Sequence, residues 1–283
     1  MARDDNIITF MDTEERCKKN ARLKESLAKS ISTQKLILEG DSIGDVNRSV
    51  YESEAKVVVS HKRTYEAASA YKDSRVVVHN FASATQPGGG VVNGANAQEE
   101  CLCRVSTLYF CLNTPEMWDG FYTPHRAEHN PLHNDDVIFT PDVTVFKTDT
   151  AKPERMGESE WFDVDIITCA APNLRENPSN QMNSGDGQNA VKLSYEEQVV
   201  LHEKRLRRIL DVAVAAGEEV LILGAFGCGA FQNDPQAVAE AARNIMADYL
   251  HAFEIIEFAI YCSPRDEQNY GYFERAMNSF LAI

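Results

Sequence analysis

The sequence predicts an α/β fold in three layers, α/β/α, with a mixed, largely parallel central sheet and an N-terminal helical extension. Three observations lead to this prediction. Short, wholly apolar runs typical of buried strands recur along the chain, amphipathic helical patterns alternate with them, and two glycine-rich loops each join a strand to a helix. Because helices cover both faces of a parallel sheet, this alternation favours a sheet between two helical layers.

The first part of the chain gives a helix–strand–helix–strand order. Residues 12–32 have a helical composition, with a weak apolar stripe through Cys17, Ala21 and Leu27. The expected elements after this helix are a strand over 56–60, a helix over 64–71 and a strand over 75–81. We place the N-terminal extension at residues 1–50 and the main domain at 51–283, since no linker divides the rest.

The middle of the chain is less regular. From Gln98 to Leu112 apolar residues recur at helical spacing, which predicts one helix. Residues 113–135 are aromatic, rich in histidine and interrupted by proline, so we expect an irregular surface loop or lid. Two short strands, 137–139 and 143–146, are expected around a proline, followed by a buried strand over 165–169. The very polar stretch 173–190 predicts a long mobile loop.

The last part carries clear helix boundaries. Ser194 and Glu197 form a capping box that opens a helix ending near Gly217. Asp234 and Pro235 suit the first positions of the next helix. The remaining predicted elements are strands over 220–223 and 255–261 and a final helix from residue 266 to the end.

Composition and charge exclude several classes of protein. The chain has 283 residues, 43% of them hydrophobic and 25% charged, as in soluble globular proteins. Its net charge of −15 would repel nucleic-acid phosphates at long range, so we expect no direct nucleic-acid binding. No apolar run approaches the ~20 residues of a membrane span, and the acidic start differs from a signal peptide. We therefore expect a cytoplasmic protein that binds no membrane.

The seven cysteines are an odd set without a CxxC pair, which argues against a secreted disulfide framework. A zinc site has to be considered, because three cysteines lie close in sequence to three histidines. Their spacing fits no common zinc finger. We therefore favour the interpretation that the cysteines are buried and that the histidines are ordinary loop residues. We expect no metal and no other cofactor. The residues concerned are Cys101, Cys103, Cys111, His125, His129 and His133.

The two glycine loops, Gly88–Gly90 and Gly227–Gly229, are candidate anion sites. Each follows a predicted strand, and open α/β sheets bind ligands at the carboxyl ends of their strands. Glycine lets backbone N–H groups crowd around a phosphate, although either loop alone could be a tight turn. Neither matches the P-loop or the dinucleotide fingerprint.

The first loop leads into Gln98, Glu99 and Glu100, a pair of carboxylates at a helix start. Acidic residues are common there because of the helix dipole, so a purely structural role is an alternative. Beside an anion site they become candidates for acid/base work on a glycosidic or phosphoester bond. The helix N-terminus lowers a carboxyl pKa, so desolvation or a bound phosphate would have to raise the pKa of a general acid.

These residues carry a family resemblance. The segment NFASATQPGGGVVNGANAQEECLCRVSTLY, residues 80–109, resembles the signature region of bacterial-type poly(ADP-ribose) glycohydrolases, the macrodomain branch marked by a triple glycine and Gln-Glu-Glu. Similarity continues through 139–146, 224–235 and 258–266, and spans about residue 10 to the end. The stretches 123–135 and 173–190 have no counterpart in it.

The resemblance implies a macrodomain-like catalytic domain that cleaves ribose–ribose O-glycosidic bonds and releases ADP-ribose. It makes Glu100 the general acid/base and has Glu99 contact ribose. Its partners would be ADP-ribose or poly(ADP-ribose) chains on modified proteins. Gly88–Gly90 would lie against the distal ribose and diphosphate, and Gly227–Phe231 would form the diphosphate loop. The implied substrate-binding residues are Asn80, Gly88, Gly89, Gly90, Gln98, Gly227, Cys228, Gly229, Ala230 and Phe231.

Two other functions remain open at this point. The same scaffold could hydrolyse mono-ADP-ribosyl groups or a related nucleotide signal. It could also be a binding module that recognises ADP-ribose without turning it over. The intact pair Glu99 and Glu100 argues against a pure binding module, which needs no acid/base group.

Overall fold

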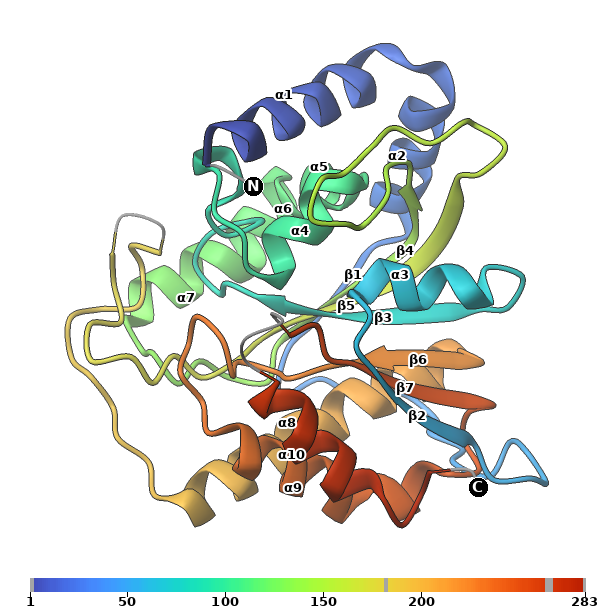
Figure 1. The fold of residues 1–283 in the computed structure, drawn as a ribbon. Coiled ribbons are helices and arrows are strands. Elements are labelled where there is room, and N and C mark those ends of the chain that lie inside the picture. The colour runs from blue at the N-terminus through green and yellow to red at the C-terminus, as the bar shows by residue number, and fades with distance from the viewer. Residues whose placement is uncertain (1–2, 181–182, 263–266, 282–283) are drawn as a thin grey trace.

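The computed structural model describes residues 3–180, 183–262 and 267–281, and within these residues seven strands form one sheet (Figure 1). The strand order is β1-β4-β5-β3-β6-β7-β2. In chain order the strands are β1 Lys35–Ile37, β2 Lys56–Ser60, β3 Val76–Ala82, β4 Val137–Val145, β5 Phe162–Ala170, β6 Val220–Leu223 and β7 Ile255–Ala259.

The sheet is mixed and largely parallel, as the sequence predicts. Parallel pairs join β5 to β3, β3 to β6, β6 to β7 and β7 to β2. Only β4 runs against its neighbours, pairing antiparallel with both β5 and β1 in the described chain. The parallel strands therefore present their carboxyl ends along one edge, where the loops after β3, β6 and β7 meet.

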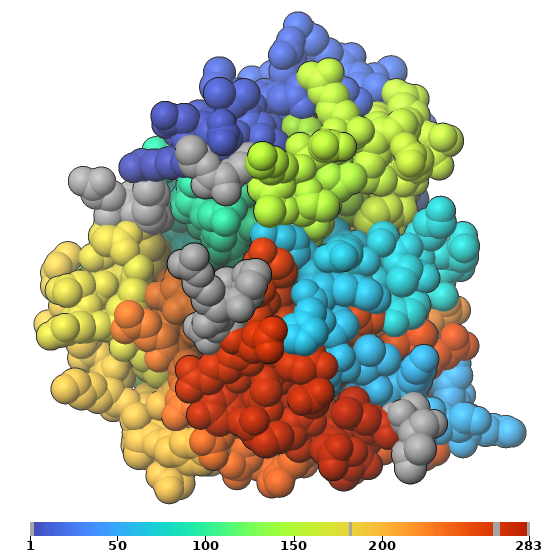
Figure 2. Space-filling view, viewed as in Figure 1, coloured from blue at the N-terminus to red at the C-terminus, as the bar shows by residue number. Residues whose placement is uncertain are grey.

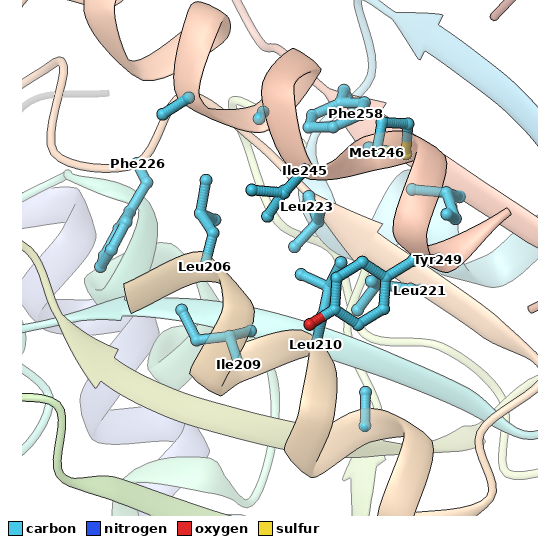
Figure 3. Packing of buried hydrophobic residues seen from close by; sticks show 14 of the residues in the cluster. Leu206, Ile209, Leu210, Leu221, Leu223, Phe226, Ile245, Met246, Tyr249 and Phe258 are labelled. Atoms are coloured by element: carbon cyan, nitrogen blue, oxygen red, sulfur yellow. The ribbon is translucent and has the colours of Figure 1, made fainter. Parts of the chain in front are cut away.

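Helices cover both faces of the sheet. On one face lie α8 Tyr195–Ala216, α9 Pro235–Met246 and α10 Gln268–Met277, whose side chains form a large apolar cluster with alternate strand residues (Figure 3). The other face carries α1 Arg3–Lys19, α2 Ala21–Thr33, α3 Thr64–Ala68, α4 Gln98–Val105, α5 Leu108–Leu112, α6 Pro115–Met117 and α7 Thr123–Glu128 (Figure 1). Short turns of other helix types are η1 Ser69–Tyr71, η2 Val91–Asn93, η3 Trp118–Tyr122 and η4 Ala247–Tyr249.

Successive side chains along each strand point to opposite faces of the sheet, so the core consists of two clusters, one on each face. In β3, Val77 faces the α8 and α9 side, whereas Val76 and Val78 face the α4 side, and all three are buried. Each fully buried side chain of this size stabilises the fold by about 1.5–3 kcal/mol. The apolar runs of the sequence are thus strands buried on both faces.

The N-terminal segment differs from the single helix predicted over 12–32. It forms two helices because Asn20 interrupts the first one and caps the second, with its side-chain oxygen accepting a hydrogen bond from the Leu23 N–H. Cys17 and Leu23 are buried, whereas Ala21 of the predicted stripe is exposed. The short strand β1, which the sequence did not reveal, follows α2 and pairs with β4.

The helix predicted from Gln98 to Leu112 is broken in two. The hydroxyl of Ser106 donates to the carbonyl of Leu102 at 2.8 Å and accepts from the Leu108 N–H at 3.2 Å, so it ends α4 and starts α5. Serine side chains compete in this way for the hydrogen bonds of the helical backbone. The spacing of apolar residues carries no information about this competition, so it predicts one continuous helix.

Residues 113–135 are also more regular than predicted. They contain α6, a turn of π-helix and α7, because Pro115 and Pro124 stand in first helical turns, where a missing N–H costs nothing. The two short strands expected around Pro141 are one strand, β4, with a register shift between Thr140 and Val143 that accommodates the proline.

The predicted ends of α8 and the predicted start of α9 are confirmed, whereas the strand predicted over 255–261 ends at Ala259 and the final helix ends at Met277 rather than at the end of the chain. The Ser194 hydroxyl accepts from the Glu197 N–H, and the Glu197 carboxylate accepts from the Ser194 N–H at 2.7 Å. Helix α8 ends at Gly217, whose φ is 75°. Asp234 caps α9. The final helix is described from Gln268, so the predicted start at residue 266 lies outside the described residues.

The polar stretch 173–190 has no helix or strand among its described residues, as predicted, but it is anchored. Asn173, Asn183 and Asp186 are buried. The carboxylate of Asp186 accepts hydrogen bonds from both of these asparagines at 2.6 Å. The hydroxyls of Ser83 and Thr85, just after β3, donate to the Asn183 side chain. The stretch is therefore fastened to the strand ends.

The N-terminal helices form one side of the face seen in Figure 2. There the N-terminal segment and the chain after β4 cover the upper part, and the C-terminal residues cover the lower part.

None of the helices in the described part of the chain is long and apolar enough to span a membrane.

Candidate active site

A cavity of about 650 Å³ opens where the parallel strands end. Its walls come from the start of α4, the loop after β6, the residues after β7 and the polar stretch 173–190. Both glycine loops and the Glu99–Glu100 pair therefore share one site, as their places after strands predict. The principal lining residues are Arg63, Phe81, Ser83, Gly89, Gln98, Glu99, Glu100, Asp149, Arg175, Asn183, Gly227, Gly229, Ala230, Phe231 and Tyr261.

The first glycine loop packs directly on the two glutamates. Gly88 and Gly89 have φ of 64° and 55°, a conformation that favours glycine. A Cβ added to Gly89 would lie 2.5 Å from Oε1 of Glu100 and 3.2 Å from Oε2 of Glu99. The N–H of Gly90 donates to Oε1 of Glu100 at 2.8 Å. The absence of side chains thus lets the backbone approach and fix the carboxylates.

Glu99 is held by the end of β3. Its Oε2 accepts a hydrogen bond from the Ser83 N–H at 2.8 Å, and its Oε1 accepts one from the Asn80 amide at 3.4 Å. Asn80 also donates to the Thr168 hydroxyl at 3.2 Å and is fully buried. The structure thus places Asn80 behind Glu99 and off the cavity wall, in a position to orient that carboxyl group.

Glu100 has a freer carboxyl group. One oxygen is bound by the Gly90 N–H, while Oε2 has no hydrogen-bond partner among the described residues. The residue is only 7% exposed, and it lines the cavity. A buried carboxyl oxygen without a partner is costly unless it is protonated or meets a ligand.

Burial changes the protonation of the pair. It raises the pKa of Glu99 well above its ordinary value, and the neighbouring charge of Glu100 adds to this effect. Burial also raises the pKa of Glu100, although the Gly90 N–H opposes it. Desolvation therefore overcomes the lowering effect of the helix N-terminus on the pKa of both carboxyl groups.

Gln98 links α4 to the strand before it. Its side-chain oxygen accepts from the Phe81 N–H at 2.9 Å, and its amide donates to the His79 carbonyl at 2.8 Å and the Thr64 hydroxyl at 3.2 Å. Gln98 lines the cavity, but both ends of its amide group are used within the protein. Its visible effect is to set the position of α4 and hence of the glutamates.

The second glycine loop has a rigid half and an open half. Gly227 has φ of 74°, and a Cβ there would lie 2.7 Å from Cβ of Ala171. A Cβ at Gly229 would meet nothing within 4 Å. The N–H groups of residues 229–231 donate to no described residue. Such a run of free N–H groups beside a cavity suits an anion.

Cys228 is set apart from its neighbours in this loop. Its thiol donates to the Phe226 carbonyl at 3.6 Å, and burial raises its pKa. Gly227, Gly229, Ala230 and Phe231 line the cavity instead. A thiol with a raised pKa and no adjacent base is a poor nucleophile.

The cysteines and histidines considered for zinc have other partners. The Arg63 guanidinium donates to the Cys101 thiol, and Cys103 and Cys111 are fully buried. Each histidine lies against a different protein oxygen: His125 against the Phe121 carbonyl, His129 against the Gly185 carbonyl and His133 against the Asp186 carboxylate. Within the described residues, no three His, Cys, Asp or Glu side chains are grouped to hold a metal.

Several residues of the site were missed from the sequence. Ser83 could have been found, since it ends the Asn-Phe-Ala-Ser lead-in to the glycines. Arg63, Arg175, Asn183 and Tyr261 carry no local signal, because only the folded chain brings them to the cavity.

The fold and site together define a class of protein: an α/β protein that holds two buried glutamates against a glycine-lined cavity. Residues 6–148 match the family model for the microbial-type PARG catalytic domain, where PARG is poly(ADP-ribose) glycohydrolase. No curated protein matches the chain. The chain belongs to the microbial-type PARG family.

Solved structures agree with this assignment. The PARG of Deinococcus radiodurans in complex with ADP-ribose is 31% identical, with a TM-score of 0.74, over 90% of this chain and 98% of that one. The PARG of Thermomonospora curvata is 26% identical, with a TM-score of 0.81, over 96% and 98% of the two chains. Its complex with the inhibitor ADP-HPD has a TM-score of 0.77 at 26% identity, over 95% and 98%.

Proposed function

We propose that this protein is a poly(ADP-ribose) glycohydrolase, a hydrolase that cleaves ribose–ribose O-glycosidic bonds and releases ADP-ribose. The observation that carries the proposal is the buried pair Glu99 and Glu100 facing a cavity between two glycine loops. Family membership and the ADP-ribose and inhibitor complexes of the similar structures support it. Gly88–Gly90 with Gln98, Glu99 and Glu100 form the family signature in this chain.

In the proposed mechanism Glu100 is the general acid and base. Its partnerless Oε2 and its raised pKa let it hold a proton and give it to the leaving ribose oxygen as the bond to the anomeric carbon breaks. The resulting carboxylate then takes a proton from a water molecule whose oxygen bonds to that carbon. The net reaction consumes one water, and Glu100 regains its proton.

Glu99 and the loops position the substrate in this mechanism. Glu99, fixed by Ser83 and Asn80, contacts ribose. The free N–H groups of the Gly227–Phe231 loop bind the diphosphate, and Phe231 packs on the distal ribose. The partners are ADP-ribose chains on modified proteins.

One experiment tests the activity against its alternatives. The purified protein is incubated with poly(ADP-ribose), with mono-ADP-ribosylated protein and with free ADP-ribose, and the products are separated by chromatography. We expect ADP-ribose to be released from the polymer. Release only from the mono-ADP-ribosylated protein would replace this function by a mono-ADP-ribosyl hydrolase. Binding of ADP-ribose without release from either substrate would make the protein a reader.

A further inference from the structure

The cavity is poor in positive charge for a site that takes a diphosphate. The chain has a net charge of −15, and three carboxyl groups lie in the cavity wall, those of Glu99, Glu100 and Asp149. In the part of the chain that the structure describes, two basic side chains line the cavity, Arg63 and Arg175. Their surroundings differ.

Arg63 already has its partners. Its guanidinium lies 3.9 Å from the carboxylate of Asp149 and 4.0 Å from the ring centroid of Tyr261, and it donates to the thiol of Cys101. A carboxyl group of the protein therefore already faces the charge of Arg63.

Arg175 has no such partner. No described carboxylate lies within ion-pair distance of its guanidinium. Its Nε donates to the Asn173 side chain at 3.1 Å, and its Nη2 donates to the Pro178 carbonyl. Nη1 makes no hydrogen bond to a described residue. Burial lowers the pKa of Arg175, although the charge of the nearby Asp186 carboxylate opposes this effect.

The position of Arg175 is fixed beside the second glycine loop. The N–H of Leu174 donates to the Phe231 carbonyl at 2.9 Å, and the Arg175 guanidinium lies 5.6 Å from the centroid of the Phe231 ring. Asn173, which holds Nε, is itself held by Asp186 at 2.6 Å. The guanidinium is thus held beside Phe231, the last residue of the second glycine loop.

We propose that Arg175 is a specificity-determining residue that binds the diphosphate of the ADP-ribose unit, together with the backbone of the second glycine loop. The proposal rests on the proposed function, since it places ADP-ribose in this cavity. Arginine suits phosphate because its planar group donates two parallel hydrogen bonds. It also supplies the positive charge that the acidic cavity otherwise lacks.

The test separates phosphate recognition from packing against Phe231. Binding of adenosine, ADP and ADP-ribose is measured by calorimetry for the wild type, Arg175→Gln, Arg175→Lys and the control Arg243→Gln. The Arg243 side chain is exposed and donates to the Asn244 side chain. We expect Arg175→Gln to weaken ADP and ADP-ribose by about 10- to 100-fold and leave adenosine unchanged, because a charge-assisted hydrogen bond contributes about 1.5–3 kcal/mol. Arg175→Lys should lose less, and Arg243→Gln should lose nothing.

Two outcomes overturn the proposal: unchanged ADP-ribose affinity in a folded Arg175→Gln protein, or an equal loss for all three ligands. If Arg175→Gln does not fold, the test uses Arg175→Lys instead. The proposal is then contradicted if the ratio of ADP affinity to adenosine affinity is the same in Arg175→Lys as in the wild type. Hydrolysis of poly(ADP-ribose) by the wild type is assayed in parallel. Its absence would refute the proposed function, whereas normal hydrolysis with no phosphate effect would refute the role of Arg175 alone.

Discussion

Glu99 and Glu100 are adjacent in the first turn of α4, yet the protein treats them differently. Side chains one residue apart on a helix point about 100° apart, so they meet different surroundings. Glu99 accepts hydrogen bonds from Ser83 and Asn80 at the end of β3. Glu100 is bound at one oxygen by Gly90 and is free at the other. The freer carboxyl group is the one suited to exchange protons with a ligand.

This asymmetry predicts different effects of the two amide substitutions. Glu100→Gln keeps the shape but cannot transfer a proton, so it should lower the single-turnover rate by ~10² to 10⁴ and leave ADP-ribose binding nearly unchanged. Glu99→Gln should affect substrate binding more than the chemical step. Both variants are measured by single-turnover kinetics and by ADP-ribose binding. A near wild-type rate for Glu100→Gln, or a larger rate loss for Glu99→Gln, would contradict the assigned roles.

Gly89 offers a second test at this scale. In Gly89→Ala the new Cβ meets the Glu100 carboxylate, and φ of 55° is unfavourable for alanine. We expect the catalytic rate to fall by about 10²-fold, the loss typical of a ~1 Å displacement of a catalytic group. Gly40→Ala is the control, because a Cβ at Gly40 meets nothing within 4 Å. Equal activity of the two variants would show that the approach of Gly89 to the glutamates is unimportant.

At the scale of elements, the second glycine loop combines a fixed backbone with an open edge. Gly227 has a positive φ, and a Cβ added there would lie 2.7 Å from Cβ of Ala171. The side-chain amide of Asn233 donates to the carbonyls of Gly227 and Pro172 and thereby ties the loop to the residues after β5. The loop can therefore present N–H groups to a ligand without rearranging.

Substitutions at the two ends of this loop should separate binding from folding. Gly229→Val places a side chain in the open space where the diphosphate would lie, so ADP-ribose binding should weaken by about tenfold or more with little change in stability. Gly227→Ala should instead lower the free energy of unfolding, since its Cβ has no room. Calorimetry with ADP-ribose and thermal unfolding give the two readouts. Unchanged affinity in folded Gly229→Val would place the phosphates elsewhere.

The elements that could be predicted are those with local chemical signals. The capping box at Ser194, the stop at Gly217 and the buried strands all follow from short stretches of sequence. The break at Ser106 and the helices around Pro115 could not, because they depend on hydrogen bonds and packing that periodicity does not record.

At the scale of the whole molecule, the site could be predicted only in part for a similar reason. The parallel sheet brings the loops after β3 and β6 to one edge, so the meeting of the two glycine loops follows from topology. Arg175 and Asn183 reach the cavity from a loop without regular structure, and only tertiary contacts place them there. The division of the chain at residue 50 stays a prediction, although β1 joins the sheet from within the first 50 residues.

The opposite end of the sheet carries a second buried acid that should control stability. Glu218, after α8, is 3% exposed, and burial together with the nearby Asp165 raises its pKa to about 9, although Arg75 opposes this. The folded protein therefore keeps a proton that the unfolded chain releases above its ordinary pKa of 4.5. Since the folded state binds more protons, stability is highest below that value and falls as pH rises toward about 9.

Glu218→Gln should remove this pH dependence. One proton of difference corresponds to about 1.4 kcal/mol per pH unit, which is an upper limit for the slope. The difference in free energy of unfolding between Glu218→Gln and the wild type should shift steadily in favour of the variant as the pH rises from 5 to 8. The same shift should reverse as the pH is lowered again. Urea unfolding at several pH values measures this, with Glu196→Gln on the exposed start of α8 as the control. A difference between variant and wild type that does not change with pH would show that Glu218 is ionised in the folded protein.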